Sequence, residues 1–300
     1  MPWKNGSSER VGIALAILAA LGFSLKAIFV KLAYSVAPVE AITLLALRMA
    51  LSLPFFIVAG FVALRSGAPI SRRDWGLLVV LGLLGYYASS LFDFLGLQYI
   101  SAGLERLILF TYPTLTIVVG VLFLGKRFDR HLIPALLLSY AGIGLAFAHD
   151  VQLAGDPRTV LIGAGFVFAS ALTYACYSAG AEVAVHRMGS VRFSALGLLV
   201  STMAAQIHFL LSEPLSALIQ PWPVYAYGAA MALFSTVLPV FWQSAAIRRI
   251  GSARTVLIGT LGPMLTLFFS WTLLDEPLSF YQLGGMALVV AGVWQISRRS

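Results

Sequence analysis

The chain has 300 residues, of which 60% are hydrophobic and only 11% are charged, and its mean hydropathy is +0.91. Because soluble domains carry about 25% charged residues, this composition excludes an ordinary soluble protein and indicates a protein embedded in a lipid bilayer. The formal net charge of +8 would suit nucleic acid as a partner, but its distribution along the chain excludes that class.

Ten apolar runs follow one another, and each is long enough to cross roughly 30 Å of hydrocarbon as an α-helix. We expect them at residues 11–33, 40–64, 75–98, 103–124, 131–149, 159–183, 191–211, 222–247, 253–274 and 280–297. The first run follows two basic residues, as a signal sequence would. It is too long for that role, no small-residue cleavage site follows it, and nine more runs come after it. The sequence therefore predicts an all-α integral membrane protein with ten transmembrane helices.

Lysine and arginine residues lie mostly on one side of the predicted membrane. With the N-terminus in the cytoplasm, fifteen of the 20 fall on the inner side and three, Lys31, Arg106 and Arg158, on the outer side. Lys26 and Arg48 lie within the spans. The positive-inside rule accounts for this asymmetry, so both termini are expected in the cytoplasm and no nucleic acid is expected as a partner.

The two halves of the chain resemble each other at an offset of 150 residues. Pro113 then lies over Pro263, and the polar face of the third run lies over that of the eighth. Because each half has an odd number of spans, the second half would enter the membrane upside down, as in the inverted repeats of secondary transporters. We therefore expect two inverted five-helix repeats, at residues 1–150 and 151–300.

Pro113 and Pro263 each lie near the centre of their span. A proline inside a helix cannot donate to the carbonyl four residues back, here Leu109 and Gly259, and it kinks the helix. In lipid such a carbonyl needs another partner or a wet cavity. One such proline would most simply mark a packed kink, but a matched pair indicates a binding site between the repeats.

Lys26 lies deep in the first span, where a charge is costly and is by default a candidate for function. Ala19 and Gly22 share its helical face, and small residues of this kind mark close contact between helices. The alternative is that the side chain extends to the headgroups. We expect Lys26 to face a central cavity and to provide the main positive charge felt by a substrate.

Polar and aromatic side chains also gather on single faces of other spans. Such a face lines either a helix interface or a solute path. The faces of spans one, three, six and eight, with the two proline-containing helices, would enclose one central cavity. The candidate substrate-binding residues are Lys26, Tyr86, Ser89, Asp93, Tyr112, Tyr174, Tyr177, Trp242 and Gln243.

The ordered set of motifs resembles the EamA family of the drug/metabolite transporter superfamily. The motifs are Phe23 followed eight residues later by Lys31, Arg48 in LALRMALSL, the two mid-span prolines, and LLDEPLSFYQLGGMALVVAGV at residues 273–293 with Glu276 in the acidic position. Lys126 occupies that acidic position in the first half and departs from the pattern. Within the family, the chain most resembles the bacterial aromatic amino-acid exporters. The resemblance implies a multi-pass protein of the bacterial inner membrane.

The resemblance implies a carrier that works by alternating access and exports small metabolites such as amino acids. An amphipathic solute with a carboxylate would suit the cavity, because Lys26 would attract the carboxylate and aromatic rings would stack on the apolar part. A carrier of phosphorylated solutes or nucleotide-sugars is the alternative, and it would need several converging cations. A membrane enzyme is a weaker alternative, since no catalytic motif is visible at depth. A channel is also a weaker alternative, because matched inverted repeats with kinked helices favour a carrier.

No cofactor or metal is expected, because the chain has a single cysteine and four scattered histidines. The expected partners are a small-molecule substrate and the lipid bilayer, while monomer and homodimer both stay open. The acids recognised within the spans, Asp93 and Glu182, lie toward span ends. Facilitated diffusion or exchange is therefore expected rather than strict proton coupling.

Overall fold

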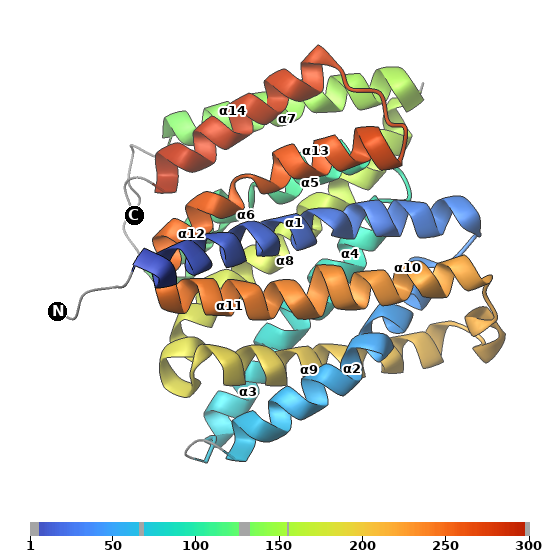
Figure 1. Ribbon diagram of the computed structural model, residues 1–300. Coiled ribbons are helices and arrows are strands. Elements are labelled where there is room, and N and C mark those ends of the chain that lie inside the picture. Colours follow the sequence, from blue (N-terminus) through green and yellow to red (C-terminus); the bar gives the residue numbers. More distant parts are fainter. Residues whose placement is uncertain (1–5, 66–68, 126–132, 155, 298–300) are drawn as a thin grey trace.

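The computed structural model describes residues 6–65, 69–125, 133–154 and 156–297, and within these ranges all regular structure is helical (Figure 1). The first half contains α1 Gly6–Val36, α2 Ala41–Arg65, α3 Arg72–Gly82, η1 Leu83–Ala88, α4 Ser89–Gly96, α5 Ala102–Leu109, α6 Tyr112–Leu124 and α7 Ile133–Ala154. The second half contains α8 Pro157–Met188, α9 Ser190–Ser212, η3 Leu215–Leu218, α10 Trp222–Ala232, η4 Leu233–Val237, α11 Leu238–Ile250, α12 Ser252–Gly259, α13 Gly262–Leu273 and α14 Phe280–Ser297.

Within the described ranges, seven helical stretches are long and apolar enough to cross a membrane. They are Ser8–Val36, Ala41–Arg65, Arg72–Gly96, Ala102–Phe123, Pro157–Val185, Ser190–Ser212 and Trp222–Ile250. A shorter apolar stretch is Phe280–Gly292 of α14. The seven stretches coincide with predicted runs, and the chain is an all-α membrane protein, as predicted.

The fifth and ninth predicted runs differ from this set. Part of the fifth run lies outside the described residues, and α7 begins at Ile133. The ninth run, 253–274, was expected as one helix but is divided between α12 and α13.

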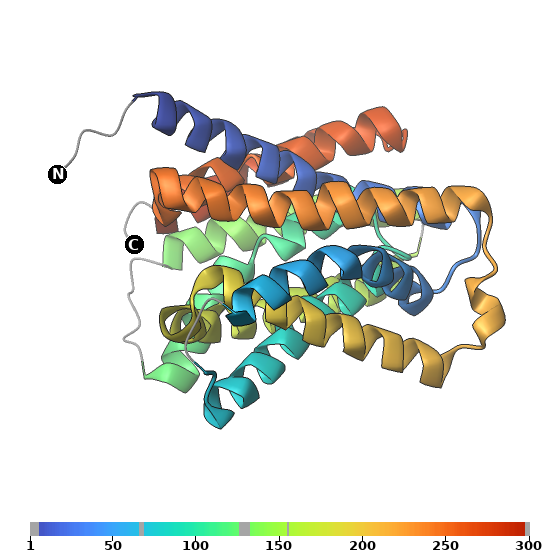
Figure 2. The ribbon, with the colours of Figure 1, turned by 60° about the horizontal axis from the view of Figure 1, so that its bottom comes forward.

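The helices lie side by side in one bundle, and α1 begins at the same end of the bundle where α14 finishes (Figures 1 and 2). The first helix of each half packs against the other half: α1 contacts α10, α11 and α13, and α8 contacts α4 and α6. The two remaining large contacts join α2 to α9 and α7 to α14. The halves are therefore interleaved.

Glycines allow the closest of these approaches. Gly142 of α7 faces Gly285 of α14, and a Cβ on either residue would overlap the carbonyl oxygen of the other. Such small-residue contacts let helix backbones approach in lipid, where packing replaces the hydrophobic driving force. Large apolar side chains, among them Leu211, Phe123 and Val58, are meanwhile exposed on the outside of the bundle, as a lipid-facing surface requires.

Helix ends follow ordinary capping chemistry. Asp156 caps α8, since its carboxylate accepts hydrogen bonds from the backbone N–H groups of Arg158 (3.0 Å) and Thr159 (3.2 Å), and Pro157 begins the helix. The hydrogen bond from the Thr159 hydroxyl is the main cause that holds the pKa of the Asp156 carboxyl below its ordinary value. Gly125, at φ 63°, ends α6 in the left-handed conformation that favours glycine.

Both halves interrupt their helices at matching positions. The π-helical segment η1 begins at Leu83, and its counterpart η4 begins at Leu233, 150 residues later. The break between α5 and α6 is likewise repeated between α12 and α13, since α6 begins at Tyr112 and α13 at Gly262. π-helical turns and broken helices in membrane proteins occur frequently at functional sites.

Each break between paired half-helices is a tight turn just before a proline. The N–H of Thr111 donates to the carbonyl of Ile108 (3.0 Å), and the N–H of Leu261 donates to the carbonyl of Ile258 (3.1 Å). The prolines follow two residues later, within the first turn of α6 and α13. In that position a missing N–H removes no helical hydrogen bond, so proline is tolerated where the helix restarts.

Candidate functional site

Three charged side chains meet inside the bundle. Nζ of Lys26 on α1 lies 2.6 Å from Oδ2 of Asp93 on α4 and 3.8 Å from Oε1 of Glu105 on α5. The lysine side chain is 17% exposed, while the two carboxylates are 1% and 0% exposed. Apart from Lys26, no donor among the described residues reaches the carboxylate oxygens. Buried charges are costly unless they are paired, so this ion cluster of Lys26, Asp93 and Glu105 is held by the attraction of both acids to Lys26.

The ion cluster corrects one step of the sequence analysis. Lys26 and Asp93 were both expected to line a cavity, but their pairing was not foreseen, and Glu105 was not considered. The expectation of facilitated diffusion or exchange rests on acids that lie apart at span ends. Asp93 and Glu105 instead share one lysine, so the positions of the acids do not support that expectation. An acid a few residues inside the fourth apolar run was the available signal for Glu105.

Arg48 borders the ion cluster from α2 and is 4% exposed. Its Nη2 donates to Oγ of Ser90 (3.0 Å), and its guanidinium carbon lies 4.9 Å from the ring centroid of Phe94. Asp93 also interacts with Arg48 electrostatically. Arg48 therefore has a hydrogen bond, an aromatic face and a carboxylate in its surroundings.

Two further acids hold the beginning of α5. The backbone N–H and the hydroxyl of Ser101 donate to the carboxylate of Asp150, both at 2.9 Å. The N–H of Ala102 donates to Oε1 of Glu276 (3.2 Å), and the hydroxyl of Ser270 donates to Oε2 of the same carboxylate. Carboxylates at a helix N-terminus are stabilised by the helix dipole. Glu276, in the acidic position of the sequence motif, thus fixes a helix of the other half.

Four predicted tyrosines form one cluster in the structure. The hydroxyls of Tyr86 on η1 and Tyr177 on α8 lie 2.7 Å apart. The ring of Tyr174 lies 5.4 Å from that of Tyr177 and 4.9 Å from that of Tyr112 on α6, measured between centroids. We call Tyr86, Tyr112, Tyr174 and Tyr177 the tyrosine cluster. Such rings offer both apolar faces and hydroxyl groups to a ligand.

The π-helical segment η1 presents a glycine to this cluster. A Cβ at Gly85 would overlap the ring of Tyr177, so the ring can lie against the backbone only because the position is glycine. The ring of Phe193 is also stacked on the ring of Tyr177, at 5.8 Å between centroids. The position of Tyr177 is therefore fixed by packing from two helical segments.

Arg106 on α5 lies between the ion cluster and the tyrosine cluster. It is 9% exposed, and its guanidinium carbon lies 5.8 Å from the ring centroid of Phe110. It is close enough to Tyr112 and Tyr174 to interact with both electrostatically. The charge count of the sequence analysis treated Arg106 as an outer-surface cation, but the side chain is buried in the bundle.

The remaining predicted residues lie outside both clusters. Ser89 packs at the contact of α4 with α8, where Oγ of Ser170 donates to its carbonyl (2.7 Å) and the two hydroxyls are 3.1 Å apart. Trp242 and Gln243 are half-buried on α11. Among the described residues, no ring contact or hydrogen bond joins these two side chains to the tyrosine cluster.

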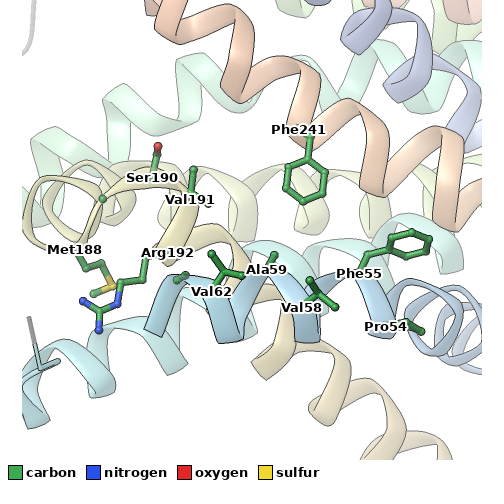
Figure 3. A pocket seen from close by; sticks show the side chains of 12 residues that line it. Pro54, Phe55, Val58, Ala59, Val62, Met188, Ser190, Val191, Arg192 and Phe241 are labelled. Atoms are coloured by element: carbon green, nitrogen blue, oxygen red, sulfur yellow. The ribbon is translucent and has the colours of Figure 1, made fainter. Parts of the chain in front are cut away.

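A separate pocket of about 870 Å³ opens between α2, the junction of α8 with α9, and α11 (Figure 3). Its lining is mainly apolar and consists of Pro54, Phe55, Val58, Ala59, Val62, Ala63, Met188, Gly189, Ser190, Val191, Arg192 and Phe241. None of the predicted site residues lines it. Since Val58 and Val62 belong to the exposed apolar surface, this pocket is a groove facing the lipid.

The chain resembles known transporters over most of its length. The model of the EamA-like transporter family matches residues 10–148 and again residues 161–298. The uncharacterized transporter YcbK of Bacillus subtilis (strain 168) is 28% identical over 295 residues, which cover 94% of this chain and 92% of that protein. An uncharacterized transporter of Archaeoglobus fulgidus is 19% identical, with 90% and 94% covered. A protein crystal structure with 18% identity aligns over 98% of this chain and 99% of the other at a TM-score of 0.63, which shows a shared fold.

Proposed function

This chain belongs to the EamA-like transporter family, and we propose that it is a carrier that exports small metabolites by alternating access. That it is a membrane transporter rests on the family and on relatives that are named transporters. The carrier mechanism is supported by the paired helix breaks, because broken helices at corresponding positions of two repeats accompany substrate sites in secondary transporters.

We propose that residues 1–150 and 151–300 are inverted repeats with five transmembrane helices each. Two observations support this organisation: the family model matches once in each half, and the helix interruptions recur after 150 residues. Ten spans place both termini on one side, in agreement with the shared end of α1 and α14 in the bundle. The charge asymmetry assigns that side to the cytoplasm of a bacterial cell, with the protein in the inner membrane.

The substrate path in this proposal passes the tyrosine cluster. One observation carries it: the hydroxyl contact between Tyr86 and Tyr177 joins a π-helical segment of one half to the first helix of the other. A solute lying there would touch both halves, as alternating access requires. Amino acids, and aromatic ones in particular, fit this surface, because aromatic rings pack edge-to-face on tyrosines.

Carriage of phosphorylated solutes or nucleotide-sugars is the second candidate. Three cations, Lys26, Arg48 and Arg106, do converge in the bundle. Lys26, however, already contacts two carboxylates, and Arg48 has Asp93 and Ser90 beside it. A dianionic phosphate would find too few uncommitted cations, so we rank this candidate lower.

Counterflow in proteoliposomes tests the carrier proposal. Vesicles with the purified chain would be loaded with one unlabelled amino acid, diluted into trace labelled solute, and compared with vesicles that lack protein. We expect a transient, saturable accumulation for at least one aromatic amino acid, because a carrier exchanges solute through one alternating site. Linear uptake without accumulation would indicate a channel, and accumulation of a nucleotide-sugar alone would support the second candidate.

A further inference from the structure

Arg106 is a buried cation without a hydrogen bond or an ion pair in the part of the chain that the structure describes. Its Nε is fully buried and unbonded there. The guanidinium carbon lies 5.8 Å from the ring centroid of Phe110, and the charge interacts electrostatically with Glu105, Tyr112 and Tyr174. Arginine is rarely buried unless its charge is paired, so a hydrogen-bond acceptor for the guanidinium is missing at this position.

The guanidinium points at the beginning of α13. A Cβ at Gly262, the first residue of that helix, would lie 2.7 Å from Nη2 of Arg106. Glycine is therefore what allows the guanidinium to approach so closely. The helix has 12 residues, and no side chain caps its N-terminus. Free backbone N–H groups and the helix dipole both favour an anion at such an end.

Cations outnumber carboxylates among the charged groups around Arg106, and Glu105 interacts electrostatically with both Lys26 and Arg106. Lys26 lies against Asp93 and Glu105, and Arg48 lies near Asp93. Asp150 and Glu276 are held further along by backbone N–H groups at the beginning of α5. The charged groups closest to Arg106 inside the bundle are thus three cations, counting Arg106 itself with Lys26 and Arg48, and two acids, Asp93 and Glu105. The carboxylate group of a ligand would offset part of this excess of positive charge beside Arg106.

The aromatic groups beside Arg106 indicate what the anion carries. Phe110 and Tyr112 lie 6.3 Å apart, and Tyr174 follows at 4.9 Å from Tyr112, measured between ring centroids. We propose that Arg106 binds the carboxylate of the transported solute at the N-terminus of α13, and that the solute is a monocarboxylate whose aromatic or large apolar group lies against Tyr112 and Tyr174. This rests on the proposed carrier function and names its substrate class.

A binding measurement on the full-length protein in detergent tests this assignment apart from transport. The probes are L-phenylalanine, L-tryptophan, L-leucine and phenylacetate. Each is compared with the corresponding amide, in which an uncharged group replaces the carboxylate. For Arg106→Gln we expect carboxylate binding about ten- to a hundredfold weaker and amide binding unchanged, since a charge-assisted hydrogen bond is lost. Arg106→Lys should lie between the two, because it keeps the charge but not the bidentate geometry.

Two further variants make the test decisive. Arg158→Gln removes the same charge from the exposed beginning of α8. It should leave the ratio of carboxylate affinity to amide affinity unchanged. Gly262→Ala keeps Arg106 but pushes the guanidinium away, so it should lower the ratio as Arg106→Gln does, even if the latter folds poorly. The assignment is overturned if wild type binds none of the four carboxylates, or if neither site variant changes the ratio. In either case counterflow of another solute would leave the carrier proposal intact.

Discussion

Nζ of Lys26 lies 2.6 Å from Oδ2 of Asp93, and this contact joins the first helix of the chain to the far end of its third span. Glu105 adds a second carboxylate at 3.8 Å. Since all three side chains are buried or nearly so, the ion pair of Lys26 with Asp93 stabilises the fold, whatever further role Lys26 has in transport. Removing one member leaves a charge without compensation.

Lys26→Met should therefore destabilise the protein, by about 3–5 kcal/mol as for other broken buried pairs. Lys26→Met/Asp93→Asn should recover part of the loss, because the double variant leaves one uncompensated carboxylate instead of two. Thermal unfolding in detergent measures both. Lys31→Met is the control, since Lys31 donates to the carbonyl of Ile100 and has no recorded carboxylate partner in the described chain. Equal stability of Lys26→Met and wild type would show that the pair contributes nothing.

Gly85→Ala should destabilise the protein by about 1–3 kcal/mol, the usual cost of overpacking. The reason is the overlap of the new Cβ with the ring of Tyr177, which is also fixed by Phe193. Gly165→Ala on α8 is the matched control, because nothing lies within 4 Å of its added Cβ. That variant should be neutral or slightly stabilising. Similar unfolding temperatures for the two variants would contradict the close contact of η1 with α8.

Pro113→Ala/Pro263→Ala should slow counterflow more than either single change does. Each proline follows a helix break, and alanine allows α5 to continue into α6 and α12 into α13. Pro54→Ala, a change within α2 at the lipid-facing groove, serves as the control and should leave the rate unchanged. If the double variant transports like wild type, the broken helices are not part of the transport cycle.

Cysteine labelling tests the proposed orientation. In a background with Cys176→Ala, a cysteine at Ser8 should resist a membrane-impermeant reagent applied to intact cells, because the N-terminus is placed in the cytoplasm. A cysteine at Ser216, in the exposed segment between α9 and α10, should react readily. The opposite labelling pattern would show that the N-terminus lies outside the cell. Labelling of both sites would contradict the proposed orientation as well.

The helices and much of the tyrosine cluster could be predicted from the sequence, because apolar runs and helical spacing are local properties. Tyr174 and Tyr177 share a helical face, and an offset of 150 residues aligns the sequence of the second half with that of the first. The structure then brings four of the nine predicted binding residues together.

The ion cluster and Arg106 could not be predicted in the same way. Which face of α1 meets which faces of α4 and α5 depends on tertiary packing, and helical periodicity does not record it. Arg106 looked like an outer-surface cation because it lies near the beginning of an apolar run. The π-helical segments were not predicted, because the spacing of apolar residues does not distinguish a π-helical turn from an α-helical one.

The most direct test of the carrier account is counterflow of aromatic amino acids by wild type, Tyr174→Ala and Tyr140→Ala in matched proteoliposomes. Tyr174 lies at the centre of the tyrosine cluster, whereas Tyr140 is an exposed tyrosine of α7 outside it. The account predicts transient accumulation by wild type and Tyr140→Ala, and a loss of about tenfold or more in apparent affinity for Tyr174→Ala, from the lost aromatic contacts. Absence of accumulation by wild type, or unchanged affinity in Tyr174→Ala, would contradict it.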